Sequence, residues 1–140
     1  MAVLRFSAAA RAELERLAAA AYPVEGCGVL IGEYGGDGEA SVVHATPGRN
    51  LVTERARDRY ELDPGDIVAA DAAARAEGLD VVGFWHTHPD HPARPSRFDT
   101  ERAWPDYLYV ICSTTGDGVA DLRAWRLPAS GGEFDEVTLA

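Results

Sequence analysis

The sequence predicts an α/β (α+β) domain with a single mixed, mostly antiparallel β-sheet flanked by helices. Two stretches with helical periodicity alternate with short apolar runs bounded by glycine, proline and acidic residues, an order that favours one sheet with helices packed on it. A chain of 140 residues suits one domain, which we assign to residues 1–140. With 46% hydrophobic and 26% charged residues, the composition favours a buried core over a disordered chain.

Capping residues and apolar spacing predict two long helices. Ser7 can cap the first, in which alanine and leucine recur at 3.6-residue spacing before Pro23 ends it. Asp63 and Pro64 open the second, and Gly78 suits its end. A third, short helix is expected to start near residue 96.

The expected strands are short apolar or alternating runs. The first two form a hairpin around the glycine-rich turn at 35–38, which includes Asp37, and the run at 80–86 is apolar on both faces, as in a central strand. The polar, arginine-rich stretch 46–63 predicts little regular structure beyond a short strand near 60–62. The strands are placed at 27–34, 39–45, 80–86, 107–113, 119–127 and 133–139.

Charge and cysteine content exclude several functions. Thirteen basic residues, all arginine, against 23 acidic ones give a net charge of -10, which argues against nucleic acid or anionic membrane as the main partner. Cys27 and Cys112 are too few for a disulfide scaffold and are expected to be buried, inert thiols. Since we find neither a signal peptide nor a membrane-spanning run, we expect a cytoplasmic protein.

The residues that carry chemistry gather after the central strand. His86 and His88 are two apart and share a face if the strand continues through His88, and Asp99 follows eleven residues later. Two histidines and one carboxylate are a catalytic zinc set, which leaves the fourth tetrahedral position for water. Zinc lowers the pKa of bound water from about 15.7 to roughly 7. Such a site also needs a base, and Glu25 is the best candidate, with flanking glycines that can let the backbone approach a ligand or metal.

The whole pattern resembles the signature of the JAMM (MPN+) zinc metalloproteases, in its short prokaryotic branch. That signature reads His-Ser/Thr-His-Pro-x6-Ser-x-x-Asp with an upstream glutamate, and each fixed position is present, from Glu25 through the run His86–Pro89 to Ser96 and Asp99. The resemblance implies a cytidine-deaminase-like JAMM/MPN core. It also implies zinc ligation by the two histidines and Asp99, Glu25 as the residue that activates water, and Ser96 as the oxyanion donor.

The resemblance further implies an amide- or isopeptide-cleaving enzyme that acts on C-terminal tails of ubiquitin-like proteins. Some members of the prokaryotic branch release cysteine from a small sulfur-carrier protein, a step in cysteine biosynthesis, and this is our specific expectation. The expected partner is thus a small carrier with an extended C-terminal tail, and a homodimer is compatible with this interpretation.

Other interpretations stay open at this point. Ser96 and Asp99 also fit a helix capping box, which is compatible with the catalytic roles. His91 and Arg94, in the proline-rich loop, are either solvated or bind substrate, Arg94 through a forked contact with a carboxylate. The arginines at 55, 57 and 59 alternate on one face if that stretch is extended. The rival functions are a non-catalytic MPN-type binding module and a zinc amidohydrolase for small molecules.

Overall fold

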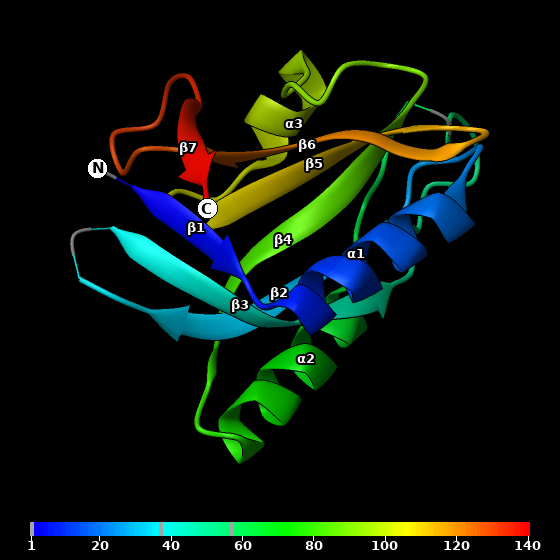
Figure 1. The fold of residues 1–140 in the computed structure, drawn as a ribbon. Coiled ribbons are helices and arrows are strands. Elements are labelled where there is room, and N and C mark those ends of the chain that lie inside the picture. Colours follow the sequence, from blue (N-terminus) through cyan, green and yellow to red (C-terminus); the bar gives the residue numbers. More distant parts are fainter. Residues whose placement is uncertain (1, 37, 57) are drawn as a thin grey trace.

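The computed structural model describes residues 2–36, 38–56 and 58–140, so Asp37 and Arg57 lie outside the described residues. Within them, the strands form a closed barrel in the order β1-β3-β2-β4-β5-β6-β7, seen as a ring of arrows with α1 packed against it (Figure 1). The strands are β1 (Val3–Phe6), β2 (Cys27–Tyr34), β3 (Glu39–Gly48), β4 (Asp80–Pro89), β5 (Leu108–Thr115), β6 (Gly118–Arg126) and β7 (Asp135–Leu139). The helices are α1 (Ala8–Ala21), α2 (Pro64–Ala76) and α3 (Arg97–Arg102).

The closed sheet corrects the expectation of an open sheet flanked by helices, and β1 is the reason. This unpredicted strand pairs in parallel with β3 on one side and with β7 on the other, which joins the two ends of the sheet. Leu4 points inward and is fully buried, while Arg5 faces solvent. The sheet is mixed as predicted, because β4 and β5 are also parallel and the remaining pairs are antiparallel.

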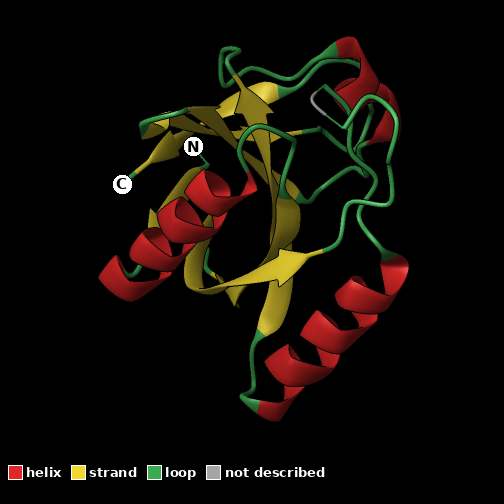
Figure 2. Ribbon diagram, turned by 90° about the vertical axis from the view of Figure 1, so that its right-hand side faces the viewer, coloured by secondary structure: helices red, strands yellow, loops and turns green. Residues whose placement is uncertain are grey.

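Two apolar clusters occupy the two faces of the sheet. The larger includes buried residues from all the strands and from α1, so it is the interior of the barrel. The smaller lies outside, where Ala70 and Ala74 of α2 pack on β2 and β4. The two helices accordingly lie on different sides of the curved sheet (Figure 2). Alternation along the strands produces this division, since Val29 belongs to the outer cluster and Leu30 to the inner one.

Most predicted elements are confirmed with small shifts at their ends. Ser7 caps α1 and Asp63 caps α2, as expected from the sequence. The important shift is in β4, which continues to Pro89 and so meets the condition for His86 and His88 to share a face. The strand expected near 60–62 is only an isolated bridge between Asn50 and Leu62. None of the helices described is long and apolar enough to cross a bilayer.

Candidate metal centre and active site

Three potential metal ligands converge where β4 ends. The Nε2 atoms of His86 and His88 are 3.2 Å apart, and Oδ2 of Asp99, from α3, lies 3.3 Å from the first and 3.0 Å from the second. All three side chains are buried, with exposed fractions between 1% and 7%. The sequence-predicted ligand set therefore meets at one point.

These spacings fit zinc. Ligand atoms about 2.0–2.1 Å from a tetrahedral zinc lie roughly 3.3–3.4 Å from one another, close to the three separations here. The tautomer of His88 agrees, because its Nδ1 is 2.8 Å from the carbonyl oxygen of Pro92 and must donate to it. In the neutral imidazole, Nε2 then carries a lone pair that faces the Asp99 carboxylate, an arrangement that a cation between them would stabilise.

The electrostatics of Asp99 and His86 favour metal binding, whereas a metal would have to displace a proton from His88. Burial opposes the charged form of Asp99, yet the neighbouring His86, the contacts with both imidazoles when these carry a proton at Nε2, and the Ser96 N–H hold the pKa of Asp99 well below its usual range. Burial lowers the pKa of His86, whereas for His88 the bonds to Asp99 and to the Pro92 carbonyl outweigh burial and raise the pKa. An ionised carboxylate beside an imidazole that burial keeps neutral is the state in which these groups bind a metal.

Tyr60 packs against this centre and has no counterpart in the sequence prediction. Its ring stacks on His86, with ring centroids 4.4 Å apart and planes inclined by 21°. Burial raises the pKa of Tyr60 well above its usual value, so the phenol stays neutral. Because Nδ1 of His86 is buried without a hydrogen-bond partner among the described residues, the stacked ring is the contact that fixes this imidazole from the side.

Ser96 and Asp99 form the capping box that the sequence left open as an alternative. The Ser96 hydroxyl oxygen accepts from the Asp99 N–H at 3.0 Å, and the Asp99 carboxylate accepts from the Ser96 N–H at 2.8 Å. The cap uses Ser96 as an acceptor only, so its hydroxyl proton can still be donated. The same two bonds hold Asp99 in the orientation that brings its Oδ2 to the histidines.

Glu25 lies beside these ligands. One of its carboxylate oxygens and one ring nitrogen of each histidine lie within 4.8 Å of one another. The side chain is 4% exposed, and its Oε1 is buried without a hydrogen-bond partner among the described residues. Burial is the main reason that the pKa of Glu25 is raised to about 8, with nearby Asp99 and Asp58 adding to the rise against the opposing effect of His88. A buried carboxyl that titrates near neutral pH suits a group that accepts and returns a proton.

The backbone around Glu25 is held by residues that the sequence analysis missed. Asn50 donates from Nδ2 to the Glu25 carbonyl at 3.1 Å, and the Glu25 N–H donates to the carbonyl of Ala56 at 2.6 Å. Thr87, between the two histidines, accepts from the Gly26 N–H through its hydroxyl oxygen at 2.8 Å. A single asparagine in a polar stretch follows no recognisable sequence pattern, so the role of Asn50 could not be predicted. Thr87 could have been singled out, because it occupies the Ser/Thr position between the two histidines of the signature.

The glycines beside Glu25 serve packing rather than ligand approach, which corrects the sequence expectation. A Cβ on Gly26 would lie 2.5 Å from the Cβ of Ala21, and one on Gly28 only 1.9 Å from the Thr46 carbonyl oxygen. The indole of Trp85 fills the remaining space and donates to that carbonyl at 2.9 Å. Because these glycines have no side chain, α1 and the buried Trp85 can pack directly behind the site.

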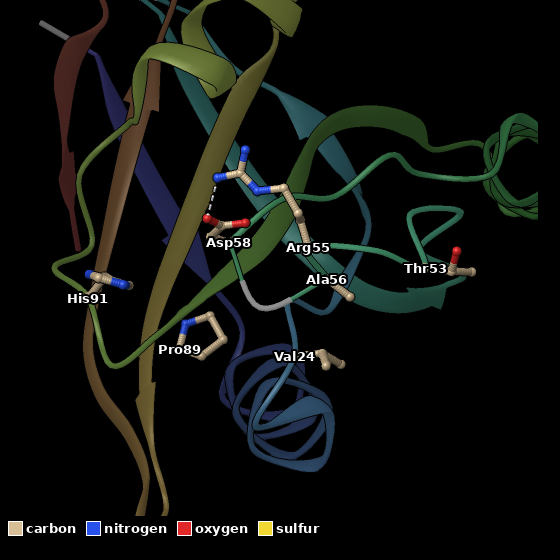
Figure 3. Close-up of a pocket in the computed structure, with 7 residues that line it drawn as sticks. All are labelled: Val24, Thr53, Arg55, Ala56, Asp58, Pro89 and His91. Atoms are coloured by element: carbon tan, nitrogen blue, oxygen red, sulfur yellow. Dashed lines mark hydrogen bonds and ion pairs between the residues drawn. The ribbon is translucent and has the colours of Figure 1, made fainter.

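Two neighbouring cavities lie at or near the metal centre. One of about 460 Å³ is lined by Glu25, His88, Ser96 and Phe98 together with four arginines, His91, Pro92 and Asp58. The other, of about 520 Å³, shares Arg55, Asp58 and His91 with it and adds Val24, Thr53, Ala56 and Pro89 (Figure 3). The two cavities are therefore neighbours, and we refer to them together as the groove; Glu25 and His88 line its part at the metal centre.

The groove brings together the residues that the sequence left as either solvated or substrate-binding. His91 and Arg94 both line it. Arg55 and Arg59 also do so, but the condition for an alternation of arginines on one face is not met, because their segment is not extended and turns at Arg55, where φ is 61°. Arg55 is paired with Asp58 at 2.7 Å, and Arg57 lies outside the described residues.

Comparisons with known proteins agree with this arrangement. The chain is 41% identical over 119 residues to the desampylase of Haloferax volcanii, covering 84% of this chain and 78% of that protein. It is 38% identical over 80 residues to a probable TtuB-protein conjugate cleaving protease of Thermus thermophilus, covering 57% of this chain and 48% of that protein. A solution structure of a protein from Desulfitobacterium hafniense superposes with a TM-score of 0.84 at 27% identity, covering 98% of this chain and 91% of the other.

The family assignment rests on a longer match. Residues 7–128 match the prokaryotic homologues of the JAB domain, a span that holds the candidate base, all three candidate ligands and the candidate oxyanion donor. The resemblance to the prokaryotic JAMM branch is thereby confirmed, and this chain belongs to the family of prokaryotic homologues of the JAB domain.

Proposed function

We propose that the protein is a zinc-dependent hydrolase that cleaves the amide or isopeptide bond at the C-terminal tail of a ubiquitin-like or sulfur-carrier protein. The observation that carries the proposal is the convergence of three donor atoms within 3.0–3.3 Å of one another, with a buried carboxyl beside them. His86, His88 and Asp99 hold the zinc. A zinc ion there supplies Lewis acidity, which lowers the pKa of water from about 15.7 to roughly 7.

Glu25 moves the protons of the reaction. Its carboxylate accepts a proton from the attacking water as the new C–O bond forms, and the carboxyl then gives that proton to the leaving nitrogen as the C–N bond breaks. Burial raises the pKa of Glu25 to about 8 in the metal-free protein, and a bound cation would lower it towards neutral pH, where the group can both accept and return a proton. Asn50 and Thr87 keep the Glu25 backbone in place through the contacts described above.

Ser96 stabilises the negative charge that develops on the carbonyl oxygen of the scissile bond. Its oxygen accepts from the backbone of α3, so the hydroxyl proton is left to point into the groove that Ser96 lines. One oxyanion donor is typically worth about 100- to 1000-fold in rate. Loss of Ser96 should therefore slow the reaction without releasing the metal.

The substrate class follows from the groove and from the relatives. The names of two relatives, desampylase and TtuB-protein conjugate cleaving protease, point to protein conjugates. The two cavities lie side by side and share Arg55, Asp58 and His91 in their linings, which suits a peptide that extends beyond the scissile bond. For the finer assignment, we infer that the leaving group is cysteine on a sulfur-carrier tail. The intact donor set speaks against a non-catalytic module, and the two adjacent cavities favour a protein tail over a small amide.

Zinc content and conjugate cleavage test the proposal. Purified protein should bind one zinc, which Asp99→Ala loses, whereas Glu25→Gln should keep zinc and lose hydrolysis. The cleavage assay follows, by mass spectrometry, a ubiquitin-like carrier that bears a C-terminal adduct. Absence of zinc from the purified protein, or full turnover by Glu25→Gln, would contradict the mechanism. Cleavage of small amides with no shortening of any carrier adduct would contradict the substrate class.

A further inference from the structure

The groove beside the metal centre is positively charged in a strongly acidic protein. The chain carries a net charge of -10, yet Arg55, Arg59, Arg94 and Arg97 all line the cavity at the metal centre. The acidic residues in that lining are Glu25, which is buried, and Asp58. Positive charge that gathers at one groove of an acidic protein selects the sign of the ligand that enters it.

Two of the four arginines have acidic partners of their own. Arg55 pairs with Asp58 at 2.7 Å and Arg97 with Glu101 at 3.2 Å. For Arg59 and Arg94, no acidic side chain lies within 4.0 Å among the residues the structure describes. These two guanidinium groups are therefore the ones with unused capacity to bind an anion.

Arg59 is held in place before any ligand arrives. Its guanidinium lies 4.8 Å from the centroid of the Phe98 ring, and its carbonyl accepts from Nδ2 of Asn50 at 3.1 Å. Asn50 bonds the carbonyl of Glu25 through the same nitrogen, so one side chain sets the position of both the candidate base and this arginine. A half-buried, stacked guanidinium loses less freedom on binding than a solvated one.

The backbone on both sides of Arg94 is fixed as well. The carbonyl oxygens of the three residues before Arg94 each accept a hydrogen bond from a side chain of a strand. Ser113 donates to the carbonyl of His91 at 2.6 Å, His88 to that of Pro92 at 2.8 Å, and Trp125 to that of Ala93 at 3.0 Å. Ala93 is 1% exposed, and Ser96 caps α3 just beyond. The loop thus presents the exposed Arg94 side chain at the groove from a rigid base, two residues from the carbonyl that orients a zinc ligand.

We propose that Arg59 and Arg94 form a binding site for a substrate carboxylate close to the scissile amide, so that the enzyme prefers conjugates with such a group. The inference rests on the proposed hydrolase function and specifies its substrate further. Guanidinium groups bind carboxylates through paired N–H···O bonds. The carboxylate can be the α-carboxylate of a leaving amino acid or an acidic side chain of the carrier tail, and the test below separates these two sources.

Four synthetic peptides, offered to the zinc-loaded full chain, test the proposal. The first two carry the same tail ending in Gly-Gly, joined to cysteine with a free carboxylate or to cysteinamide. The other two end in cysteinamide and carry glutamate or glutamine just before Gly-Gly. The measurements are kcat/KM for each peptide and Kd for each peptide with the inactive Glu25→Gln protein, so binding is read independently of turnover.

We expect at least one carboxylate peptide to exceed its neutral partner by about 10-fold or more in kcat/KM and in affinity, the scale of a charge-assisted bond. A difference within the first pair of peptides identifies the α-carboxylate of the leaving amino acid as the group that is bound, and a difference within the second pair identifies an acidic side chain of the tail. Arg94→Gln and Arg59→Gln should reduce this preference to near unity, and Arg94→Lys should restore only part of it, because lysine lacks the fork. The matched control is Arg102→Gln, since Arg102 lies 4.9 Å from the same Phe98 ring and should leave the preference unchanged.

The outcomes distinguish this inference from the function on which it rests. Equal cleavage and equal binding of charged and neutral peptides would overturn the carboxylate site while leaving the hydrolase intact. A preference that survives both Arg59→Gln and Arg94→Gln would overturn the assignment to these residues. Cleavage of none of the peptides by zinc-loaded protein would overturn the proposed function and this inference with it.

Discussion

Replacing Glu25 by glutamine should stabilise the metal-free protein, by an amount that grows with pH. The carboxyl is buried, has one oxygen without a partner among the described residues, and has a pKa raised from 4.5 to about 8. In the unfolded chain the group ionises near its ordinary pKa, so folding becomes less favourable as pH rises from 4.5 towards 8. Glutamine has the same shape and no charge to lose, so its variant is free of this penalty.

The size of the effect follows from the pKa difference. At about pH 7.5, where the unfolded state is ionised and the folded state mostly is not, the penalty is about 4 kcal/mol, and at about pH 5 it is about 1 kcal/mol. The difference in unfolding free energy between Glu25→Gln and wild type should thus increase by about 3 kcal/mol over this interval. For a chain of 140 residues, that corresponds to roughly 10 °C in Tm.

Thermal unfolding of both proteins in a chelator, followed at several pH values, measures this difference. The buried amide of the variant brings a cost that does not change with pH, so the slope against pH is the diagnostic quantity. Zinc provides an internal control, because a bound cation favours the carboxylate and should shrink the difference. A difference that stays constant from pH 5 to 7.5 would refute the claim that Glu25 is desolvated in the folded protein.

Three further outcomes are expected. Zinc should raise the Tm of wild type, since a ligand that binds only the folded state stabilises it, and Asp99→Ala should abolish that rise in a thermal scan with and without zinc. Asn50→Ala removes hydrogen bonds to the carbonyls of Glu25 and Arg59. Steady-state kinetics should therefore show that kcat falls about 10-fold or more, while elemental analysis still finds zinc. An unchanged kcat would contradict the positioning role of Asn50. Leu14→Ala, at a fully buried position of α1, should cost about 3–5 kcal/mol in a urea titration with zinc content unaltered, and a cost below about 1 kcal/mol would contradict its place in the core.

The sequence carried strong signals wherever local chemistry decides the structure. Ser7 and Asp63 predicted the starts of α1 and α2, since a capping side chain acts on its own helix. The approach of His86 and His88 to Asp99 could be anticipated because strand alternation and the family signature agree there. These features depend on neighbours within a few residues or on a fixed spacing.

Features that depend on distant partners were not predictable. The four residues of β1 form a strand only because they lie between β3 and β7, and a run that short next to a helical pattern has no signal of its own. The two sides of this strand come from positions more than ninety residues apart. The closing of the barrel, and with it the correction of the open sheet, therefore appears only in three dimensions.

The segment between β3 and α2 shows how an irregular stretch can organise a site. The side chain of Asn50 has all its hydrogen-bonding groups satisfied, since Nδ2 donates to the carbonyls of Glu25 and Arg59 and Oδ1 accepts from the N–H groups of Val52 and Glu61. Tyr60, from the same segment, stacks on His86. One short stretch without a repeating pattern thus supports the candidate base, one candidate zinc ligand and the proposed carboxylate site.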